Sequence, residues 1–417
     1  MYSSGESEWQ DLTVSGCQFD KSSLVVKDGE GPHSVTVSDS EFSGLVTTSG
    51  YPAVYVYSQV AQLTLSGVSV THTTTTSKAA VYVVNSSSSF RGSLTVADSW
   101  VAFNDAGPSY PAGMQVRGYD VTVTDSGFVA NEGPALAVDP YYSSTAGVTI
   151  SNSVFFGNDA TTSAATAAVS LKDMPVASSI SGCYFIQNRG SEGGALAVSD
   201  MVVDVSGSYF YENEATAHGG AIYIQYSANA TVSYSSFGGN TAADGGAAAA
   251  LSGAGLSLKS TSFSDNSATT NGGGIYVVGE ARLTALLCSF SGNSAENGGG
   301  WYSNASPVNG EMLLIRGNNA TLSGGGFACN GNGVSILNGW ISNNKATTGP
   351  AYSCASGCNT YLTHVYVASN NGNSGCGNDF VTHPLAEVEA AVTRELSALP
   401  DLDMDYILAL VEENTSA

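Results

Sequence analysis

A repeat of about 26 residues constrains the fold of this chain more than any other feature of its sequence. Between residues 193 and 301 each copy holds a glycine pair, such as Gly219-Gly220, and an aromatic residue followed three residues later by asparagine, such as Phe237 and Asn240. A fixed period of about 20 to 50 residues is typical of a solenoid, in which each coil packs only against its neighbours. We therefore expect a stack of similar coils.

Segments that alternate apolar with small polar residues precede the aromatic positions. The early copies are residues 12–15, 35–38, 63–66, 94–97, 121–124 and 148–151. Such alternation, rich in Val and Thr, predicts half-buried β-strands. The apolar residues expected to face the core change from even to odd positions at bends such as Ser15-Gly16, and they change again after the aromatic residue. A third strand begins at the glycine pair. Three short strands per coil, with no helical period inside, predict an all-β parallel β-helix.

The aromatic position recurs 14 times between residues 12 and 370, which predicts a β-helix domain of about 14 coils over residues 1–380. After Pro384 the apolar residues recur at helical spacing. This predicts a short α-helical segment over residues 381–417, divided near Pro400. The segment has two interpretations, which are a cap folded over the last coil and a docking helix for a partner subunit.

An asparagine follows the aromatic position in eleven consecutive coils. These residues are Asn104, Asn131, Asn158, Asn188, Asn213, Asn240, Asn266, Asn293, Asn318, Asn344 and Asn370. Stacked amide side chains can donate to and accept from one another, and they can pair with the backbone of a bend. We therefore expect a structural asparagine ladder rather than a ligand site.

Four of the seven cysteines lie near the C-terminal end of the repeats. Cys329 and Cys354 hold the same place in adjacent coils. In-register parallel neighbours lie about 4.8 Å apart, which is within the Cα range of a disulfide. A second bridge is expected between Cys358 and Cys376, and free thiols or metal ligation are the alternatives. The three other cysteines are Cys17, Cys183 and Cys288, and we expect them to be small core residues.

Acidic side chains stack at two places in the sequence. One bend position holds Asp39, Asp98 and Asp125, and the position after the ladder asparagine holds Asp105, Glu132 and Asp159. Carboxylates about 5 Å apart repel one another unless they are solvated, protonated or bridged by a cation. The second row therefore predicts a calcium site, with solvated turn acids as the alternative. No other metal or cofactor is expected.

Charge and composition restrict the partners. The net charge is −23, from 12 Lys plus Arg against 35 Asp plus Glu, whereas nucleic acids and anionic membranes require basic patches. No apolar run approaches 18 residues, so no membrane insertion is expected. Asn-x-Ser/Thr sequons predict glycosylation at Asn85, Asn229, Asn304, Asn319 and Asn414. The expected partners are other protein subunits, in homo- or hetero-assembly, or surface glycans contacted by tyrosines such as Tyr223 and Tyr276.

The paired motifs resemble the repeats of the polymorphic outer-membrane proteins of chlamydiae and similar Pmp-like repeats, best over residues 101–344. One copy that carries the resemblance is Gly193-Gly194 with Phe210 and Asn213. The resemblance implies a right-handed parallel β-helix used for adhesion or display at a cell surface. On this basis we expect an extracellular structural or adhesive module that assembles through its faces and ends, for example into filaments.

A carbohydrate-active enzyme of the pectate-lyase-like type is the alternative, since parallel β-helices also host such enzymes. Those enzymes cluster acids on one sheet and add a basic residue. The bases nearest the stacked acids here, Arg117 and Lys172, are isolated and no histidine accompanies them. The sequence therefore favours a protein that is not an enzyme.

Overall fold

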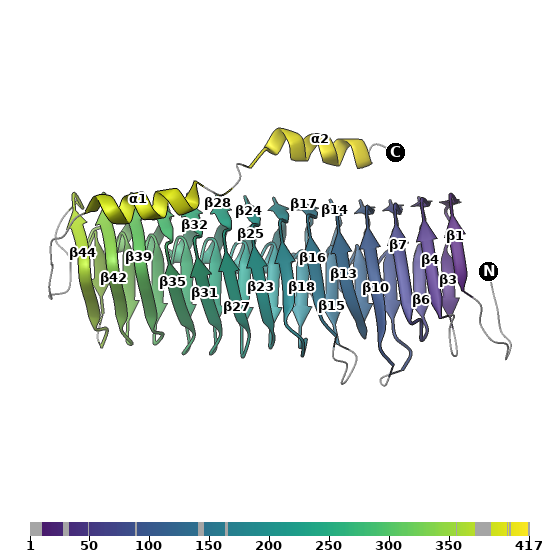
Figure 1. Ribbon diagram of the computed structural model, residues 1–417, viewed down its shortest axis with the longest axis horizontal. Coiled ribbons are helices and arrows are strands. Elements are labelled where there is room, and N and C mark those ends of the chain that lie inside the picture. The colour runs from purple at the N-terminus through teal and green to yellow at the C-terminus, as the bar shows by residue number, and fades with distance from the viewer. Residues whose placement is uncertain are drawn as a thin grey trace. The chain divides into compact units, whose positions relative to one another are not determined.

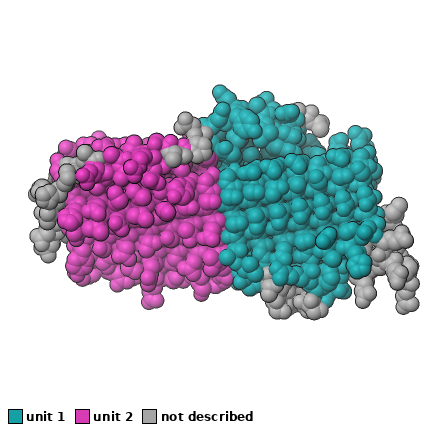
Figure 2. All heavy atoms as spheres, in the orientation of Figure 1, with its two compact units in different colours: residues 1–190, 402–417 teal, residues 191–401 magenta. Residues whose placement is uncertain are grey.

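The computed structural model describes residues 11–27, 33–48, 50–87, 90–140, 146–162, 166–355, 357–371, 385–397, 399 and 402–415. These residues form an all-β parallel solenoid with two short C-terminal helices (Figure 1), which confirms the predicted fold class. The chain divides into two compact units. Unit 1 comprises residues 1–190 and 402–417, and unit 2 comprises residues 191–401 (Figure 2).

Unit 1 has three strands per coil, as predicted. The first strands are β1 (Leu12–Ser15), β4 (Ser34–Ser38), β7 (Gln62–Ser66), β10 (Gly92–Ala97), β13 (Tyr119–Thr124), β16 (Val148–Ser151) and β19 (Ser178–Ser181). The second strands are β2 (Gln18–Asp20), β5 (Glu41–Ser43), β8 (Ser69–Thr71), β11 (Trp100–Ala102), β14 (Gly127–Val129), β17 (Val154–Phe156) and β20 (Tyr184–Ile186). The third strands are β3 (Leu24–Lys27), β6 (Val54–Tyr57), β9 (Val81–Val84), β12 (Met114–Arg117), β15 (Leu136–Asp139) and β18 (Val169–Lys172).

In unit 2 the first and second strands are separate in four coils and continuous in three. The first strands are β23 (Val202–Ser206), β27 (Asn229–Ser233), β31 (Gly255–Lys259) and β35 (Arg282–Leu286), and the second strands are β24 (Tyr209–Tyr211), β28 (Ser236–Gly238), β32 (Ser262–Ser264) and β36 (Ser289–Ser291). The continuous strands are β39 (Val308–Arg316), β42 (Val334–Ser342) and β44 (Thr360–Ala368). The third strands are β22 (Leu196–Ser199), β26 (Ile222–Gln225), β30 (Ala248–Leu251), β34 (Ile275–Val278), β38 (Trp301–Asn304), β41 (Phe327–Asn330) and β43 (Tyr352–Cys354).

The aromatic strand therefore occurs in seven coils of each unit, in agreement with the predicted 14 positions. The third strand occurs in six described coils of unit 1 and in seven of unit 2, so about 13 turns are complete. The first, second and third strands pair in parallel and in register with their equivalents in neighbouring coils, as in Phe128 with Phe155 and Ile222 with Ala248.

The sequence did not predict a further short strand between the ladder asparagine and the glycine pair. Its copies are β21 (Arg189–Glu192), β25 (Glu214–His218), β29 (Thr241–Asp244), β33 (Ser267–Asn271), β37 (Ser294–Asn297) and β40 (Asn319–Ser323). In this part of the chain the spacing from asparagine to glycine is five or six residues in each coil, as from Asn240 to Gly245, so the segments stack and pair. In unit 1 the corresponding segments differ in length and form only isolated bridges, such as Asp105 with Glu132.

Each core is a column of identical positions. The rings of Phe210, Phe237, Phe263 and Phe290 stack in successive coils with centroids 4.6, 4.8 and 5.0 Å apart, and all four are almost completely buried. The glycine pair is required because the coils touch there. A Cβ atom on Gly220 would collide with the carbonyl oxygen of Gly246 in the next coil, and Gly219 has φ of +63°.

The asparagine ladder is present in both units. In unit 2, Nδ2 of Asn240 donates to Oδ1 of Asn266 at 2.9 Å and to the carbonyl oxygen of Phe210 at 3.0 Å. The same pattern joins Asn104, Asn131 and Asn158 in unit 1. In unit 2 it continues from Asn266 through Asn293, Asn318 and Asn344 to Asn370.

The two helices pack on different units. Helix α1 (Leu385–Leu396) lies against β39 and β42, with Val392 fully buried and Arg316 3.3 Å from Glu389. This position, along the side of the coils (Figure 1), differs from the predicted cap over the last coil. Helix α2 (Met404–Thr415) packs on β11 of unit 1 and buries Ile407 and Val411. Neither of these helices is long and apolar enough to cross a membrane, within the part of the chain that the structure describes.

Candidate functional site

A row of polar side chains marks one corner of unit 2. Each member immediately precedes a glycine pair, so the members lie one above another in successive coils. They are Glu192, His218, Asp244, Asn271, Asn297 and Ser323, which end strands β21, β25, β29, β33, β37 and β40. We call this set the corner row. Parallel pairing places His218 beside Asp244, Asp244 beside Asn271, and Asn271 beside Asn297.

His218 lies between two carboxylates of the corner row. Its Nδ1 atom is 2.9 Å from Oε2 of Glu192, and its Nε2 atom is 3.8 Å from Oδ2 of Asp244. The side chains of His218, Glu192 and Asp244 are 28%, 25% and 19% exposed, so the group is sheltered and still reaches solvent. The hydrogen bond to Glu192 fixes the imidazole orientation and leaves Nε2 on the side of Asp244.

Two tyrosines flank the imidazole ring. Tyr223, Ala249 and Tyr276 are consecutive neighbours on the outer face of β26, β30 and β34. The His218 ring centroid lies 6.1 Å from that of Tyr223 and 5.9 Å from that of Tyr276, and both pairs are stacked. Ala249 separates the two tyrosines in this row and is fully buried although its side chain is small. The His218 ring therefore fills the space between the two tyrosine rings.

These surroundings shift the protonation equilibria of three groups. The hydrogen bond to Glu192 raises the pKa of His218 above 6.5, with the charges of Glu192 and Asp244 acting in the same direction and burial opposing them. Burial is the main cause that raises the pKa of Tyr223 and of Tyr276 to about 12. At neutral pH the tyrosines are therefore neutral hydroxyl groups, and His218 holds its proton to a higher pH than an ordinary histidine does.

Asp244 is held by a chain of hydrogen bonds along the corner row. The Oδ1 atom of Asp244 accepts from the backbone N–H of Asn271 at 3.1 Å and from its Nδ2 at 2.9 Å. Asn297 donates to Oδ1 of Asn271 at 3.2 Å, and Ser323 donates to Oδ1 of Asn297 at 2.8 Å. The donors all point toward Asp244, so the chain holds its Oδ1 atom in place and leaves its Oδ2 atom toward His218.

The arrangement can transfer protons. Imidazole titrates near neutral pH, and here one ring nitrogen is fixed by a carboxylate while the other lies on the side of a second carboxylate. This is the arrangement of a general acid or base held by an orienting partner. The same imidazole cannot bridge Glu192 and Asp244 through one metal ion, because the two carboxylates approach different ring nitrogens.

The predicted calcium residues lie in unit 1. The Asp105 carboxylate accepts from the backbone N–H of Gly107 at 2.7 Å, and that of Asp159 accepts from the N–H of Thr161 at 3.0 Å. Glu132 pairs with Asp105 through its backbone and has an exposed side chain. Two of the three carboxylates therefore hold their own turns, and calcium binding stays a prediction.

The other acidic row has a conformational explanation. Asp39, Asp98 and Asp125 have φ values of +47°, +47° and +49°. Aspartate and asparagine tolerate this left-handed conformation better than most other residues, which suits them to the first bend of the coil.

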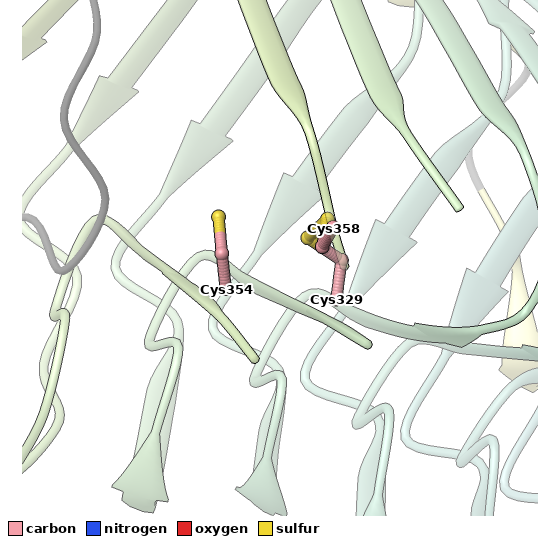
Figure 3. Close-up of side chains that lie close together, drawn as sticks. All are labelled: Cys329, Cys354 and Cys358. Atoms are coloured by element: carbon pink, nitrogen blue, oxygen red, sulfur yellow. A yellow bond between two sulfur atoms is a disulfide. The ribbon is translucent and has the colours of Figure 1, made fainter. Parts of the chain in front are cut away.

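The C-terminal cysteines cluster as expected but pair differently. Cys329 and Cys354 are register neighbours in β41 and β43, yet the disulfide joins Cys329 to Cys358, with Cα atoms 6.0 Å apart (Figure 3). The predicted Cys329–Cys354 bridge is therefore wrong. Side chains of in-register neighbours point in the same direction, whereas Cys358 follows the turn after β43 and returns toward Cys329. Cys376 lies outside the described residues.

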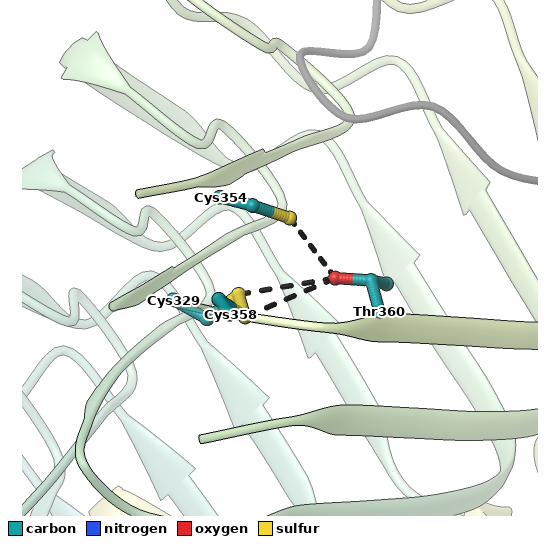
Figure 4. The surroundings of a disulfide bond; sticks show 4 residues. All are labelled: Cys329, Cys354, Cys358 and Thr360. Carbon is teal, nitrogen blue, oxygen red and sulfur yellow. Dashed lines mark hydrogen bonds between the residues drawn. A yellow bond between two sulfur atoms is a disulfide. The ribbon is translucent and has the colours of Figure 1, made fainter. Parts of the chain in front are cut away.

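A hydroxyl group adjoins the cysteine cluster. The Oγ1 atom of Thr360 lies 2.9 Å from Sγ of Cys354 and 3.8 and 4.0 Å from Sγ of Cys329 and Cys358 (Figure 4). Three sulfur atoms within 4.8 Å of one another would suit a metal, but a disulfide already occupies two of them. The cluster therefore stabilises the end of unit 2. Of the predicted core cysteines, Cys183 and Cys288 are fully buried, and Cys17 is partly exposed.

One predicted glycosylation site is also corrected. Asn85 is fully buried, and its Nδ2 atom donates to the carbonyl oxygens of Phe90 and Gly118 at 2.6 and 3.3 Å. A glycan cannot be accommodated on this amide in the folded chain. Asn229 and Asn319 are exposed, and Asn304 and Asn414 are partly exposed, so these four stay predictions.

His218 was not predicted from the sequence, because the stacked acids considered there occupy other positions of the repeat. The available signal was the residue that precedes each glycine pair. Glu192, His218 and Asp244 hold this position in three consecutive copies of the repeat. Reading that position down the stack would have brought them together.

Comparison with known proteins agrees with this architecture. The family model for the right-handed beta helix region matches residues 2–176 and 175–310. The chain belongs to this family. No curated protein matches it. A solved structure that is similar is that of the periplasmic alginate epimerase AlgG, at 11% identity and a TM-score of 0.39, over 80% of this chain and 77% of that chain. So distant a likeness carries no argument about activity.

The expectation that the chain is not an enzyme requires correction. The right-handed β-helix family to which the chain belongs does not exclude catalysis. The expectation rested on acids that lacked a basic or histidine partner. That ground is removed by His218, which lies against Glu192 and near Asp244.

Proposed function

We propose that this chain is a carbohydrate-active right-handed β-helix protein in which His218 transfers a proton to a bound polysaccharide. The observation that carries the proposal is the partly exposed imidazole that Glu192 holds at Nδ1 and that faces Asp244 through Nε2. The raised pKa lets this imidazole hold its proton to a higher pH than an ordinary histidine does, as suits a general acid.

In this proposal the three side chains have separate roles. Protonated His218 gives its Nε2 proton to the oxygen of the glycosidic bond as that C–O bond breaks. Water adds its hydroxyl group to the sugar carbon, and the proton that water loses passes to the solvent, so atoms and charges balance. Glu192 positions the imidazole at Nδ1, Asp244 lies on the side of Nε2, and the chain from Ser323 to Asn271 holds the Asp244 side chain in place.

The test is the substitution His218→Gln in the full chain. We expect the release of reducing ends from a panel of polysaccharides to fall by about 10²- to 10⁴-fold, the range of general acid–base catalysis. His33→Gln is the matched control, because His33 belongs to unit 1 and lies outside the corner row. Equal activity of the wild type and H218Q, or a wild type that cleaves no member of the panel, would overturn the proposal.

A second candidate is an extracellular adhesive or structural module. It is favoured by neighbouring tyrosines on unit 1. The ring centroids of Tyr55 and Tyr82 lie 5.4 Å apart in a stacked pair, and that of Tyr51 lies 4.7 Å from that of Tyr55 in a tilted pair. The resemblance to Pmp-like repeats supports the same candidate. A disulfide suits an oxidising location at the cell surface or outside the cell. Electron microscopy of the native material tests it, since a protein found only as single particles would count against filament assembly.

A further inference from the structure

We infer that the substrate of the His218 site is an electrically neutral, hydroxyl-rich polysaccharide, bound lengthwise along the outer face of the third-strand sheet of unit 2. This inference rests on the proposed function, because it identifies the polymer that His218 would act upon. Four observations carry it: the absence of charge on that face, the orientation of its tyrosines, the amides of the corner row and the acids at both edges.

The outer face of this sheet carries no charged side chain from β22 to β43. Its outward residues that reach solvent are Gln225, Leu251, Tyr276, Val278, Tyr302, Asn304, Asn330 and Ser353, whereas Ala197, Ser199, Tyr223, Ala249 and Ala328 point the same way but are buried. The matching sheet of unit 1 presents Lys27, Arg117, Asp139 and Lys172. A face without charge suits a ligand without charge.

The tyrosines of this face present hydroxyl groups rather than flat ring surfaces. Tyr276 and Tyr302 stack on one another, with centroids 5.8 Å apart and planes 22° apart, so their faces are turned to each other along the stack. The Tyr223 hydroxyl donates to Oε1 of Gln225 at 2.9 Å, and Asn304 and Asn330 are register neighbours at the ends of β38 and β41. A polymer lying along the stack would therefore meet alternating hydroxyl and amide groups.

The corner row continues this hydrogen-bonding surface beside His218. Asn271, Asn297 and Ser323 follow Asp244 at one residue per coil, and coils repeat at about 4.8 Å. Each of these three side chains is only partly buried. A sugar polymer also repeats its hydroxyl groups along its length, so an extended chain can bond to several coils while one of its linkages lies at His218.

Acids at both edges of the face exclude a polyanion. Glu192 and Asp244 lie at the corner, and Asp200 and Glu280 stand exposed at the bends that follow β22 and β34. Of the cations of unit 2 in the described residues, Lys259 covers Tyr234, Arg316 approaches Glu389, Lys345 pairs with Asn319 through its backbone, Arg394 is in α1, and Arg282 begins β35 two residues after Glu280. A polyuronate would be repelled here, whereas a neutral glycan would not.

Isothermal titration of the full chain tests the inference with oligosaccharides of equal length. The neutral probes are β-1,4-linked gluco-, manno- and xylo-oligosaccharides, and the anionic probes are oligogalacturonate and oligoalginate. We expect at least one neutral probe to bind at least tenfold more tightly than either anionic probe. Tyr302→Ala and Asn297→Ala should each weaken that neutral probe by about tenfold, and Tyr82→Ala on the stacked pair of unit 1 is the matched control.

A gain-of-binding variant sharpens the test. Gln225→Lys combined with Asn304→Lys adds two cations to the face and should improve oligogalacturonate binding by at least tenfold. Tighter binding of an anionic probe by the wild type, no binding of any neutral probe, or equal binding by the Tyr302 and Tyr82 variants would overturn the inference.

The two proposals fail in different ways. If H218Q loses turnover while Tyr302→Ala binds normally, proton transfer by His218 stands and the binding face is wrong. If Tyr302→Ala and Asn297→Ala lose binding while H218Q keeps full turnover, the binding face stands and the proton-transfer role is wrong.

Discussion

Single buried amides join neighbouring coils through several hydrogen bonds at once. Asn266 is fully buried; it donates to Asn293 and to the carbonyl oxygen of Phe237, and it accepts from both the backbone and the side chain of Asn240. Each unpaired buried group costs about 1–3 kcal/mol. The ladder therefore stabilises the stack more than any exposed polar contact can.

Asn266→Ala should lower the free energy of unfolding by about 3 kcal/mol or more, because it leaves donors on Asn240 and the Phe237 carbonyl without that partner. Chemical denaturation with urea measures the change. The control is Asn229→Ala, since Asn229 is exposed and its loss should cost under about 0.5 kcal/mol. Equal effects of the two substitutions would contradict a structural role for the ladder.

The stability of unit 2 should depend on the protonation of His218. Its pKa is raised in the folded chain above the ordinary 6.5, so its contribution is complete below that value and is lost as the pH rises through the folded pKa. The thermal midpoint should therefore fall as the pH rises above 6.5, and H218Q should show a weaker fall. A pH dependence that is identical in wild type and H218Q would contradict the hydrogen-bonded imidazole.

Among the elements, the last coils of unit 2 depend on a covalent link that the repeat itself does not supply. The Cys329–Cys358 bridge closes a separation of 29 residues. By the loop-entropy relation, Cys358→Ser should lower the free energy of unfolding by about 3.5 kcal/mol. Cys288→Ser is the matched control and should cost much less, because Ser208 and Ser235 hold the same place in other coils. Equal midpoints for wild type and C358S would exclude a stabilising bridge.

Helix α1 should detach when its buried contact is removed. Val392 is fully buried where α1 lies on β39 and β42, and an unpaired carboxylate there would cost about 3 kcal/mol or more. Val392→Asp should therefore speed proteolytic cleavage within residues 385–397. Thr393→Asp places the same charge on the exposed side and should leave the cleavage rate unchanged.

For the whole molecule, self-repulsion follows from the net charge of −23. The thermal midpoint should rise between 10 and 300 mM NaCl, by roughly a few degrees, because salt screens this repulsion. Calcium chloride at matched ionic strength should give a larger rise if Asp105, Glu132 and Asp159 bind the ion. An equal rise with the two salts would remove the calcium prediction.

The sequence alone determined the coil. Equivalent positions of neighbouring coils pack on one another, so the same residue types must recur at a fixed period. The buried aromatic residue and the asparagine of each coil could therefore be predicted from the sequence. The Asp residues of the first bend also follow from a local requirement, because aspartate tolerates a left-handed backbone conformation better than most residues.

Tertiary structure decided the features that depend on direction and on sequence-distant partners. Cys329 and Cys354 are in register, but the turn at Cys358 chooses the disulfide partner. From its sequence, helix α1 could cover either the last coil or the side of several coils. Val392 is buried where α1 packs against β39 and β42, so the helix lies along the side of the coils. The candidate role of His218 depends on its position between Glu192 and Asp244. Residues about 26 apart in the chain become neighbours only in the folded solenoid, so this position could not be read from the local sequence.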